Sequence, residues 1–124
     1  MLQLIAIAAG GAFGAVARYG ASNAVYGLLG RDFPWGTLAV NVLGSFLMGL
    51  LFVLFLERLS AAPEWRAAIL IGFLGAFTTF STFSIETLNL LEEGAIVGAF
   101  VNMIMSVLLC VLLCWVGIIL GRSL

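Results

Sequence analysis

The residues best suited to chemistry lie in one polar run inside an otherwise apolar stretch of the chain. Residues 72–87 carry six hydroxyl side chains and one carboxylate, Glu86. Serine and threonine side chains compete for backbone hydrogen bonds, and β-branched threonine packs poorly in a helix. We therefore expect a helix break near residues 75–79, where freed carbonyl groups could coordinate a cation.

Two phenylalanines within this run, Phe80 and Phe83, are interleaved with hydroxyl side chains. An aromatic ring has a negative face and a positive edge. Rings that present their edges to a pore could therefore attract an anion without a fixed charge. In the simpler interpretation, both phenylalanines are ordinary apolar residues of a membrane helix.

Two further sets of polar side chains recur every four residues, a spacing that places each set along one face of a helix. The sets are Thr37, Asn41 and Ser45, and then Asn102, Ser106, Cys110 and Cys114. Polar groups are costly in lipid, so their placement is informative. Hydrogen bonds between packed helices and a polar pathway both explain these stripes, and the sequence leaves the two interpretations open.

Arg18 and Glu86 are the ionisable residues that lie well inside apolar segments. A charge at such a depth needs a partner or a watery vestibule. The two side chains could pair with each other, or Arg18 could be neutralised by Ser22, Asn23 and nearby backbone carbonyls. The sequence does not decide between these partners.

The composition excludes several classes of protein. Apolar residues make up 64% of the chain and charged residues 9%, and the mean hydropathy is +1.25, so lipid is the expected solvent. A net charge of −1 without a basic patch argues against nucleic acid as a partner. There is no histidine, and we expect Cys110 and Cys114 to be buried thiols rather than zinc ligands. No nucleophile–base pair is visible, so we expect no enzymatic activity.

Four apolar segments are long enough to cross a bilayer core about 30 Å thick. They cover residues 2–29, 37–56, 67–91 and 95–120, in a single membrane domain of residues 1–124. No basic residue precedes Arg18, so the first segment is interpreted as a retained helix rather than a signal peptide. Small residues gather on helix faces and predict close helix packing. They are Gly10, Gly11, Gly14 and Ala17 in the first segment, and Gly44, Gly49, Gly72 and Gly75 in the second and third.

The charges outside these segments hardly favour one orientation. With four spans, one side of the membrane holds Arg58, Arg66 and Arg122, and the other holds Arg31, joined by Arg18 if its side chain reaches that way. Under the positive-inside rule this is a weak bias. Such a chain could insert in both orientations, which would permit an antiparallel dimer.

Three motifs together resemble the Fluc (CrcB) family of fluoride channels. The third segment contains the run Gly75-Ala76-Phe77-Thr78-Thr79-Phe80-Ser81-Thr82-Phe83-Ser84-x-Glu86. The first contains Gly10-Gly11-x-x-Gly14-x-x-x-Arg18, and the second opens with Gly36-Thr37-Leu38-Ala39-Val40-Asn41. The likeness extends along nearly the whole chain.

This resemblance implies an all-α, integral membrane four-helix protein with a broken third transmembrane helix. Such a protein would assemble as an antiparallel, dual-topology homodimer with two fluoride pores. It would be a multi-pass protein of the bacterial cytoplasmic (inner) membrane and would export toxic fluoride by passive permeation. Its partners would be a second copy of itself, fluoride and membrane lipid.

The resemblance also assigns roles to residues. Phe80 and Phe83 would meet fluoride with their ring edges. Asn41 and hydroxyl groups near Ser81 and Thr82 would donate hydrogen bonds to the ion, and Ser84, Glu86 and Thr37 would continue the polar route. One structural sodium ion (Na+) at the dimer centre would be held by the backbone carbonyls of Gly75 and Thr78 from both chains, and Arg18 would belong to the vestibule.

Two positions depart from the family pattern. Ala76 stands where a second glycine is common, and Cys110 stands where a serine is expected. A thiol is a weaker hydrogen-bond donor than a hydroxyl, which leaves the ligand from the fourth segment in doubt.

Two other classes of membrane protein compete with this interpretation. A dual-topology multidrug exporter needs a membrane-embedded carboxylate, which usually lies in its first helix, where this chain carries Arg18 and no acid. An accessory subunit without transport would leave the polar run and both stripes unexplained.

Overall fold

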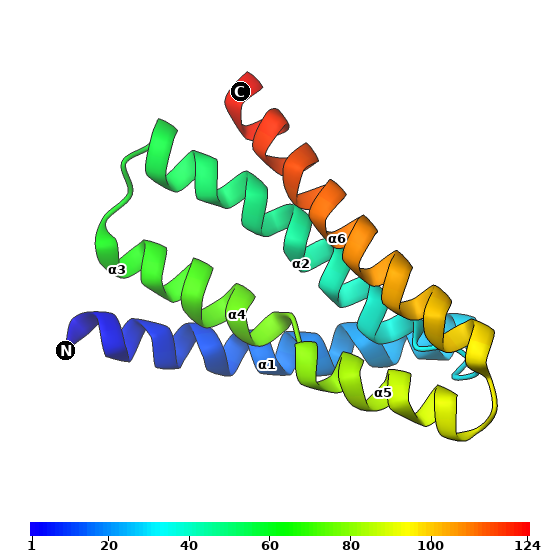
Figure 1. Cartoon of the computed structure of the whole chain (residues 1–124). Helices are drawn as coiled ribbons and strands as arrows, with labels where there is room; N and C mark the ends of the chain where they lie inside the picture. The colour runs from blue at the N-terminus through cyan, green and yellow to red at the C-terminus, as the bar shows by residue number, and fades with distance from the viewer.

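The computed structural model describes residues 1–124, and every element in it is helical (Figure 1). The first two spans consist of α1 (Leu2–Leu29) and of α2 (Trp35–Val53), which continues as the π-helical segment η1 (Leu54–Arg58). The third combines α3 (Pro63–Arg66), the π-helical segment η2 (Ala67–Phe73), α4 (Leu74–Phe77) and α5 (Phe80–Glu92). The fourth is α6 (Ile96–Ser123).

Four helical segments are long and apolar enough to cross a membrane: Leu2–Leu29, Trp35–Arg58, Pro63–Glu92 and Ile96–Ser123. The chain is therefore a multi-pass membrane protein. The third segment begins at Pro63, before the expected residue 67, because proline suits the first helical position and Glu64 lies in the first turn.

Turns with unusual backbone separate the spans. Gly30 ends α1 with a φ of 86°, and Gly94 follows α5 with a φ of 84°. Side chains disfavour this left-handed region, and glycine adopts it without a steric penalty. These two turns lie at one end of the molecule, whereas both termini and the η1–α3 connection lie at the other (Figure 1).

The helices pack as two close pairs, and glycine permits the contact in each. A Cβ atom added at Gly10 or Gly14 of α1 would overlap the backbone of η2, at the carbonyls of Ala68 and Phe73. In the second pair, Gly49 of α2 lies directly against the α6 backbone at Cys114. The expectation of close packing at these glycines is confirmed.

Gly75 makes no such contact within a single chain. The residue is exposed, and a Cβ added there would meet nothing within 4 Å. The short helix α4 is therefore open to the surroundings at Gly75.

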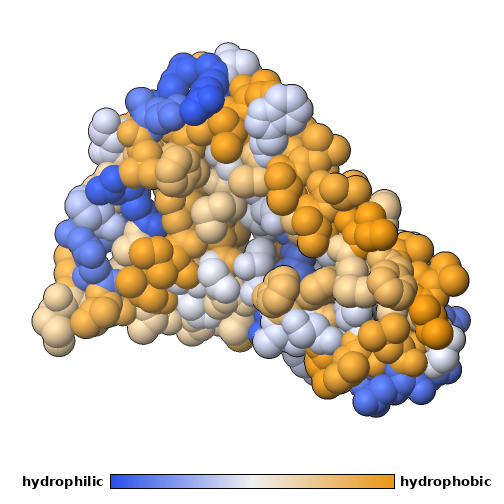
Figure 2. Space-filling view, viewed as in Figure 1, coloured by the Kyte–Doolittle hydropathy of each residue, from blue (hydrophilic) through white to orange (hydrophobic).

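The interior of a single chain is small, with 19 of 124 residues buried. Apolar side chains cover most of the visible surface, and hydrophilic ones gather mainly towards its ends (Figure 2). Since lipid tails solvate apolar side chains, this surface suits a membrane rather than water.

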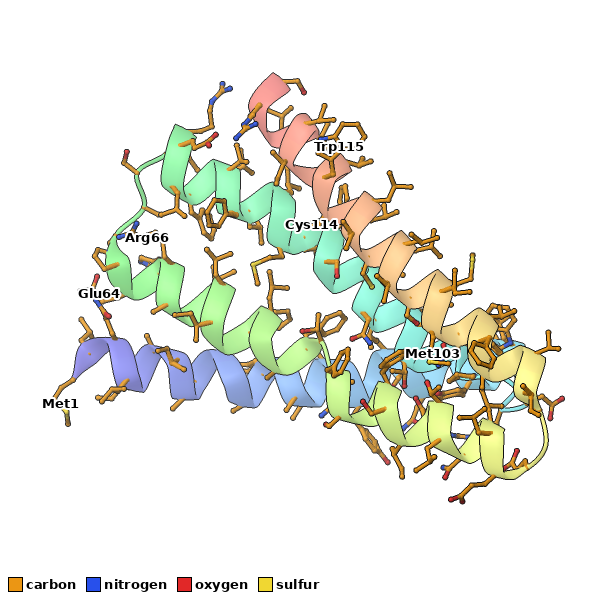
Figure 3. The ribbon with its side chains drawn as sticks, viewed as in Figure 1. Met1, Glu64, Arg66, Met103, Cys114 and Trp115 are labelled. Atoms are coloured by element: carbon orange, nitrogen blue, oxygen red, sulfur yellow. The ribbon has the colours of Figure 1, made fainter.

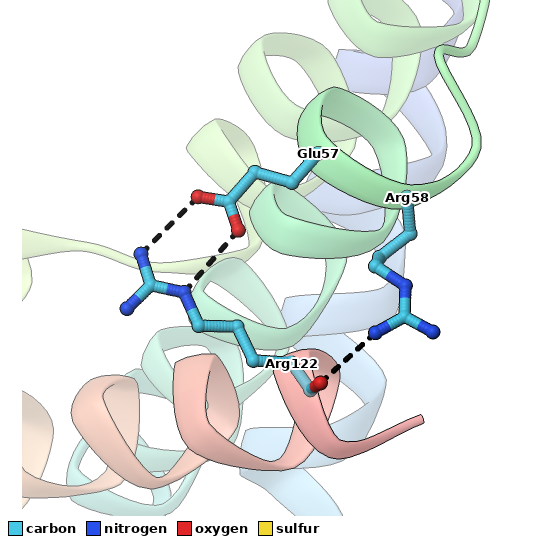
Figure 4. Close-up of polar contacts among 3 residues, drawn as sticks. All are labelled: Glu57, Arg58 and Arg122. Carbon is cyan, nitrogen blue, oxygen red and sulfur yellow. Dashed lines mark hydrogen bonds and ion pairs between the residues drawn. The ribbon is translucent and has the colours of Figure 1, made fainter.

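Charged side chains join the ends of η1 and α6 (Figure 4). Arg122 donates to both carboxylate oxygens of Glu57, at 3.2 and 3.1 Å. Arg58 donates to the backbone carbonyl of Arg122 at 2.9 Å. The same end of the molecule carries Glu64 and Arg66 of α3 (Figure 3).

Candidate functional site

Two extended residues, Thr78 and Thr79, separate α4 from α5 within the third span. Their backbone groups need partners other than those of a continuous helix. Asn41 of α2 supplies two: its Nδ2 donates to the Thr79 carbonyl at 3.0 Å, and its Oδ1 accepts from the Thr79 N–H at 2.7 Å. One N–H of the Asn41 amide remains for another acceptor.

The new helix that follows has its own cap. The Thr79 Oγ1 atom accepts a hydrogen bond from the Thr82 N–H at 3.2 Å, as a residue at the start of a helix does. The same hydroxyl donates to Thr82 Oγ1 at 3.1 Å and lies 3.5 Å from Ser81 Oγ. The hydroxyl-rich sequence therefore stabilises the start of α5 locally.

A groove of about 650 Å³ runs beside these residues and is bounded by three of the four spans. Phe80 and Phe83 line it together, with ring centroids 5.2 Å apart and planes tilted by 44°. Phe80 is 76% exposed, so much of its ring is free to meet another molecule. Asn41, Thr78 and Thr79 form the polar part of the same wall.

The polar stripes of α2 and α6 were open to two interpretations, a polar pathway and hydrogen bonds between packed helices. Ser45 of α2 and Ser106, Cys110 and Cys114 of α6 line the groove, together with Asn41. Cys114 lies on the C-terminal half of α6, next to the exposed Trp115 (Figure 3). Neither thiol is fully buried, contrary to our expectation, because both face the open groove.

The inner end of the α6 stripe serves helix packing instead. Asn102 is buried and donates to Thr87 Oγ1 of α5 at 2.8 Å, while Ser106 Oγ donates to Asn102 Oδ1 at 3.3 Å. Hydrogen bonding between helices and the lining of a polar groove are thus both present along one stripe.

Arg18 and Glu86 do not pair with each other. Arg18 Nε donates to the backbone carbonyl of Ala76 at 3.1 Å, which brings its charge to the end of α4. Ser22 donates to the Arg18 carbonyl and does not neutralise the guanidinium group. Of the partners left open by the sequence, a backbone carbonyl is the one the structure shows.

Glu86 and Thr37 lie apart from the groove, around the phenol of Tyr26. Tyr26 Oη donates to Glu86 Oε2 at 2.7 Å and lies 3.4 Å from Thr37 Oγ1. Glu86 and Tyr26 line a smaller pocket of about 190 Å³ near the 30–34 turn. Sequence reasoning missed Tyr26, because a tyrosine near the end of an apolar span is typical of an anchor at the membrane interface.

The remaining hydroxyl residues of the predicted site line neither cavity. Ser84 Oγ donates to the Phe80 carbonyl of its own helix at 2.9 Å, and both Ser81 and Ser84 are exposed. Thr82 is engaged with Thr79, as described above. In a single chain, these three residues are therefore not gathered with Asn41 and Phe83.

The carbonyl oxygens of Gly75 and Thr78 fit the predicted sodium site in one respect. No backbone or side-chain donor of the chain reaches either oxygen. Unwound backbone with free carbonyls is a known arrangement for coordinating sodium in membrane proteins. Two such oxygens are too few to enclose a cation, so a single chain offers half of the predicted site.

Comparison with known proteins shows the family to which this chain belongs. Residues 5–118 match the family described as CrcB-like protein, Camphor Resistance (CrcB). The chain is 60% identical over 123 residues to the fluoride-specific ion channel FluC of Magnetococcus marinus, covering 99% of this chain and 100% of that protein. The chain belongs to the CrcB-like family.

Two other relatives of this CrcB-like chain carry the same name, fluoride-specific ion channel FluC. The protein of Methylococcus capsulatus is 59% identical over 99% of this chain, which spans 54% of that protein's length. The protein of Coxiella burnetii is 52% identical over 99% of this chain and 100% of its own length. The matched range, residues 5–118, spans the positions of the predicted site, from Arg18 to Glu86.

Proposed function

We propose that this protein is a fluoride-selective ion channel that exports fluoride by passive permeation. The observation that carries the proposal is the identity of 59–60% across the whole chain to proteins named fluoride-specific ion channels. Those names describe transport, so we assign no enzymatic activity to this chain. This chain covers about half of the Methylococcus capsulatus protein. It covers the whole of the Magnetococcus marinus protein, which has the same name without that extra half.

The groove supports this function chemically. Fluoride is small and strongly hydrated, so a pore must replace its water with other hydrogen-bond donors. The remaining N–H of Asn41 is one donor, and the tilted rings of Phe80 and Phe83 offer positive edges next to it. All of these groups are uncharged, so none would hold the ion as a fixed positive charge would, and conduction requires that the ion can leave.

A second copy of the chain, inserted in the opposite orientation, would complete this site. Phe80 is 76% exposed, Gly75 is exposed, and the groove opens to the surface. One N–H of Asn41 and the carbonyls of Gly75 and Thr78 have no partner in a single chain. Such unpaired groups are costly against lipid tails, whereas another protein surface can satisfy them. The antiparallel dimer would bear two pores, in which Ser81, Thr82, Ser84, Thr37 and Glu86 extend the polar route and Arg18 serves the vestibule.

The same dimer would complete the sodium site. The free carbonyls of Gly75 and Thr78 from both chains would together provide four oxygen ligands at the centre. Sodium there would tie the interrupted third spans to one another without taking part in permeation. In a bacterial inner membrane, the channel would relieve the cytoplasm of toxic fluoride.

Fluoride flux from liposomes tests the proposal. The purified protein, reconstituted in liposomes, is expected to release fluoride far faster than chloride, as read by ion electrodes. An equal chloride flux, or a fluoride flux no greater than that of empty liposomes, would disprove the channel function.

Matched variants test the ring-edge mechanism in the same assay. Phe80→Ile and Phe83→Ile should each lower fluoride flux by about two- to tenfold, if a ring edge contributes as much to the ion as to another aromatic ring, about 0.5–1.5 kcal/mol. Phe13→Ile is the control, since Phe13 is 73% exposed on α1 and lies outside the groove. Equal flux in all three variants would remove the ring edges from the mechanism.

A further inference from the structure

The phenol of Tyr26 joins three helices at a point beyond the groove. It lies on α1, donates to Glu86 Oε2 of α5 at 2.7 Å, and lies 3.4 Å from Thr37 Oγ1 of α2. The distance to Glu86 is typical of a strong O–H···O hydrogen bond, and the distance to Thr37 is long for one. Tyr26 therefore interacts mainly with Glu86.

The single phenol proton fixes the direction of this chain of contacts. Because Tyr26 donates that proton to Glu86, any hydrogen bond with Thr37 must be donated by Thr37. The donors thus run from Thr37 to Tyr26 to Glu86. Two of these three residues were expected on the polar route, and Tyr26 links them.

The ring of Tyr26 is held in place from two sides. A Cβ atom added at Gly36 would overlap the ring, so the absence of a side chain there makes room for it. On another side, the Arg31 guanidinium carbon lies 4.6 Å from the ring centroid, within the range of a cation–π interaction. These contacts limit the positions from which the phenol can reach Glu86.

Glu86 has only this one hydrogen bond to a side chain. Its other oxygen, Oε1, is buried and has no partner. The pocket around it also contains Arg31, Asp32 and Glu93, and α2 and α6 place no ionisable side chain in it. Since Glu86 borders the polar route proposed above, a carboxylate free to turn would bring its negative charge towards a passing anion.

We propose that Tyr26 is a positioning residue for Glu86, whose carboxylate it fixes in one orientation, turned towards α1, at the edge of the polar route. This inference rests on the proposed channel function, because it concerns how an anion passes a fixed carboxylate. It assigns to Tyr26 a role in conduction rather than in anchoring the chain at the membrane interface.

The first test removes the hydroxyl group alone. Tyr26→Phe keeps the ring against Gly36, and we expect it to lower fluoride flux roughly tenfold, the order expected from one hydrogen bond to a charged group. Tyr19→Phe is the matched control, because Tyr19 lies on the same helix, is 69% exposed, and its hydroxyl forms no hydrogen bond. Flux in Tyr26→Phe equal to that of Tyr19→Phe would overturn the proposal.

A double variant separates the positioning of Glu86 by Tyr26 from a general structural role of Tyr26. In a Glu86→Gln background there is no charge to orient, so adding Tyr26→Phe should leave flux unchanged. The same tenfold loss in that background would overturn the proposal, because Tyr26 would then act independently of Glu86.

Carbon NMR provides a readout that does not depend on flux. The Glu86 carboxyl signal, assigned by its absence in Glu86→Gln, should shift in Tyr26→Phe and stay in place in Tyr19→Phe. An unshifted signal in a protein that conducts fluoride overturns the role of Tyr26 alone. Absence of flux in the wild-type protein, with the signal shifted as expected, overturns the channel function and the conduction role of Tyr26 with it.

Discussion

At the scale of single residues, the amide of Asn41 has two competing uses. Its oxygen and one N–H pair with the backbone of Thr79, so the side chain replaces the helical hydrogen bonds that the interruption removes. The other N–H is the one available to an ion in the groove. The same side chain therefore contributes both to the stability of the third span and to the chemistry of the groove.

This double use predicts that Asn41 matters for folding as well as for flux. Asn41→Ala would leave two partly buried backbone groups of Thr79 without partners, at a cost of about 2 kcal/mol. Thermal unfolding in detergent should show a clear decrease in the midpoint. Ser45→Ala is the control, because Ser45 lines the same groove and makes no side-chain hydrogen bond. A midpoint for Asn41→Ala as high as that of the control would contradict the structural use.

Several partners of single residues could not be foreseen from the sequence. Arg18 donates to a backbone carbonyl 58 positions away, and every residue carries a carbonyl, so no side-chain pattern marks Ala76 as the acceptor. Glu86 meets Tyr26 at a separation of 60 residues. Such contacts depend on how the helices cross, which residue type and spacing do not determine.

At the scale of helices, the sequence was more informative. Length and hydropathy predicted four apolar segments, and the four helical segments of the structure lie at the same places with small differences at their ends. The interruption was predicted at residues 75–79. In the structure only Thr78 and Thr79 of that range have extended backbone, and Gly75 lies within α4. Steric and hydrogen-bonding properties of threonine act locally, so they are visible in the sequence.

The polar stripes show where such reasoning stops. One spacing of four residues places Asn102 in a buried hydrogen bond and Cys110 at the groove, because α6 changes its neighbours along its length. Periodicity defines a face of a helix and says nothing of what covers it. The choice between packing and pathway therefore required the positions of the other helices.

The close pair of α1 and η2 gives a prediction at this scale. Gly14→Ala would drive a methyl group into the backbone of η2 at Phe73, where neither helix can give way unless the two separate. We expect loss of the folded protein, measured as a lower unfolding midpoint and aggregation on size-exclusion chromatography. Gly27→Ala on the same helix meets nothing within 4 Å and should be neutral or stabilising by up to about 1 kcal/mol. Equal behaviour of the two variants would contradict the packing described here.

At the scale of the whole molecule, the chain has a small interior and few charges to orient it. Three arginines lie at the end with both termini, and Arg31 lies at the turn near the other end. This weak asymmetry underlies the proposal of two opposite orientations in one membrane.

Labelling of a single cysteine tests that proposal. In a variant with Cys110→Ser and Cys114→Ser, Asp32→Cys places one thiol on the exposed turn between α1 and α2. A reagent that cannot cross membranes should label about half of the protein in intact cells, and the rest after the membrane is permeabilised. Arg66→Cys, at the opposite end of the molecule, is the matched variant and should give the same division. Complete labelling of one variant and none of the other would establish a single orientation.

The two extended residues of the third span also have an electrostatic consequence. A continuous helix would present no ends at this depth, but the interruption creates two: the carbonyl end of α4, with partial negative charge, and the amide end of α5, with partial positive charge. Arg18 donates to a carbonyl of the first end, whereas no carboxylate contacts the second. The start of α5 lies at the groove beside Phe80, so the fold directs a positive potential at the place proposed for an anion, without a lysine anywhere in the chain.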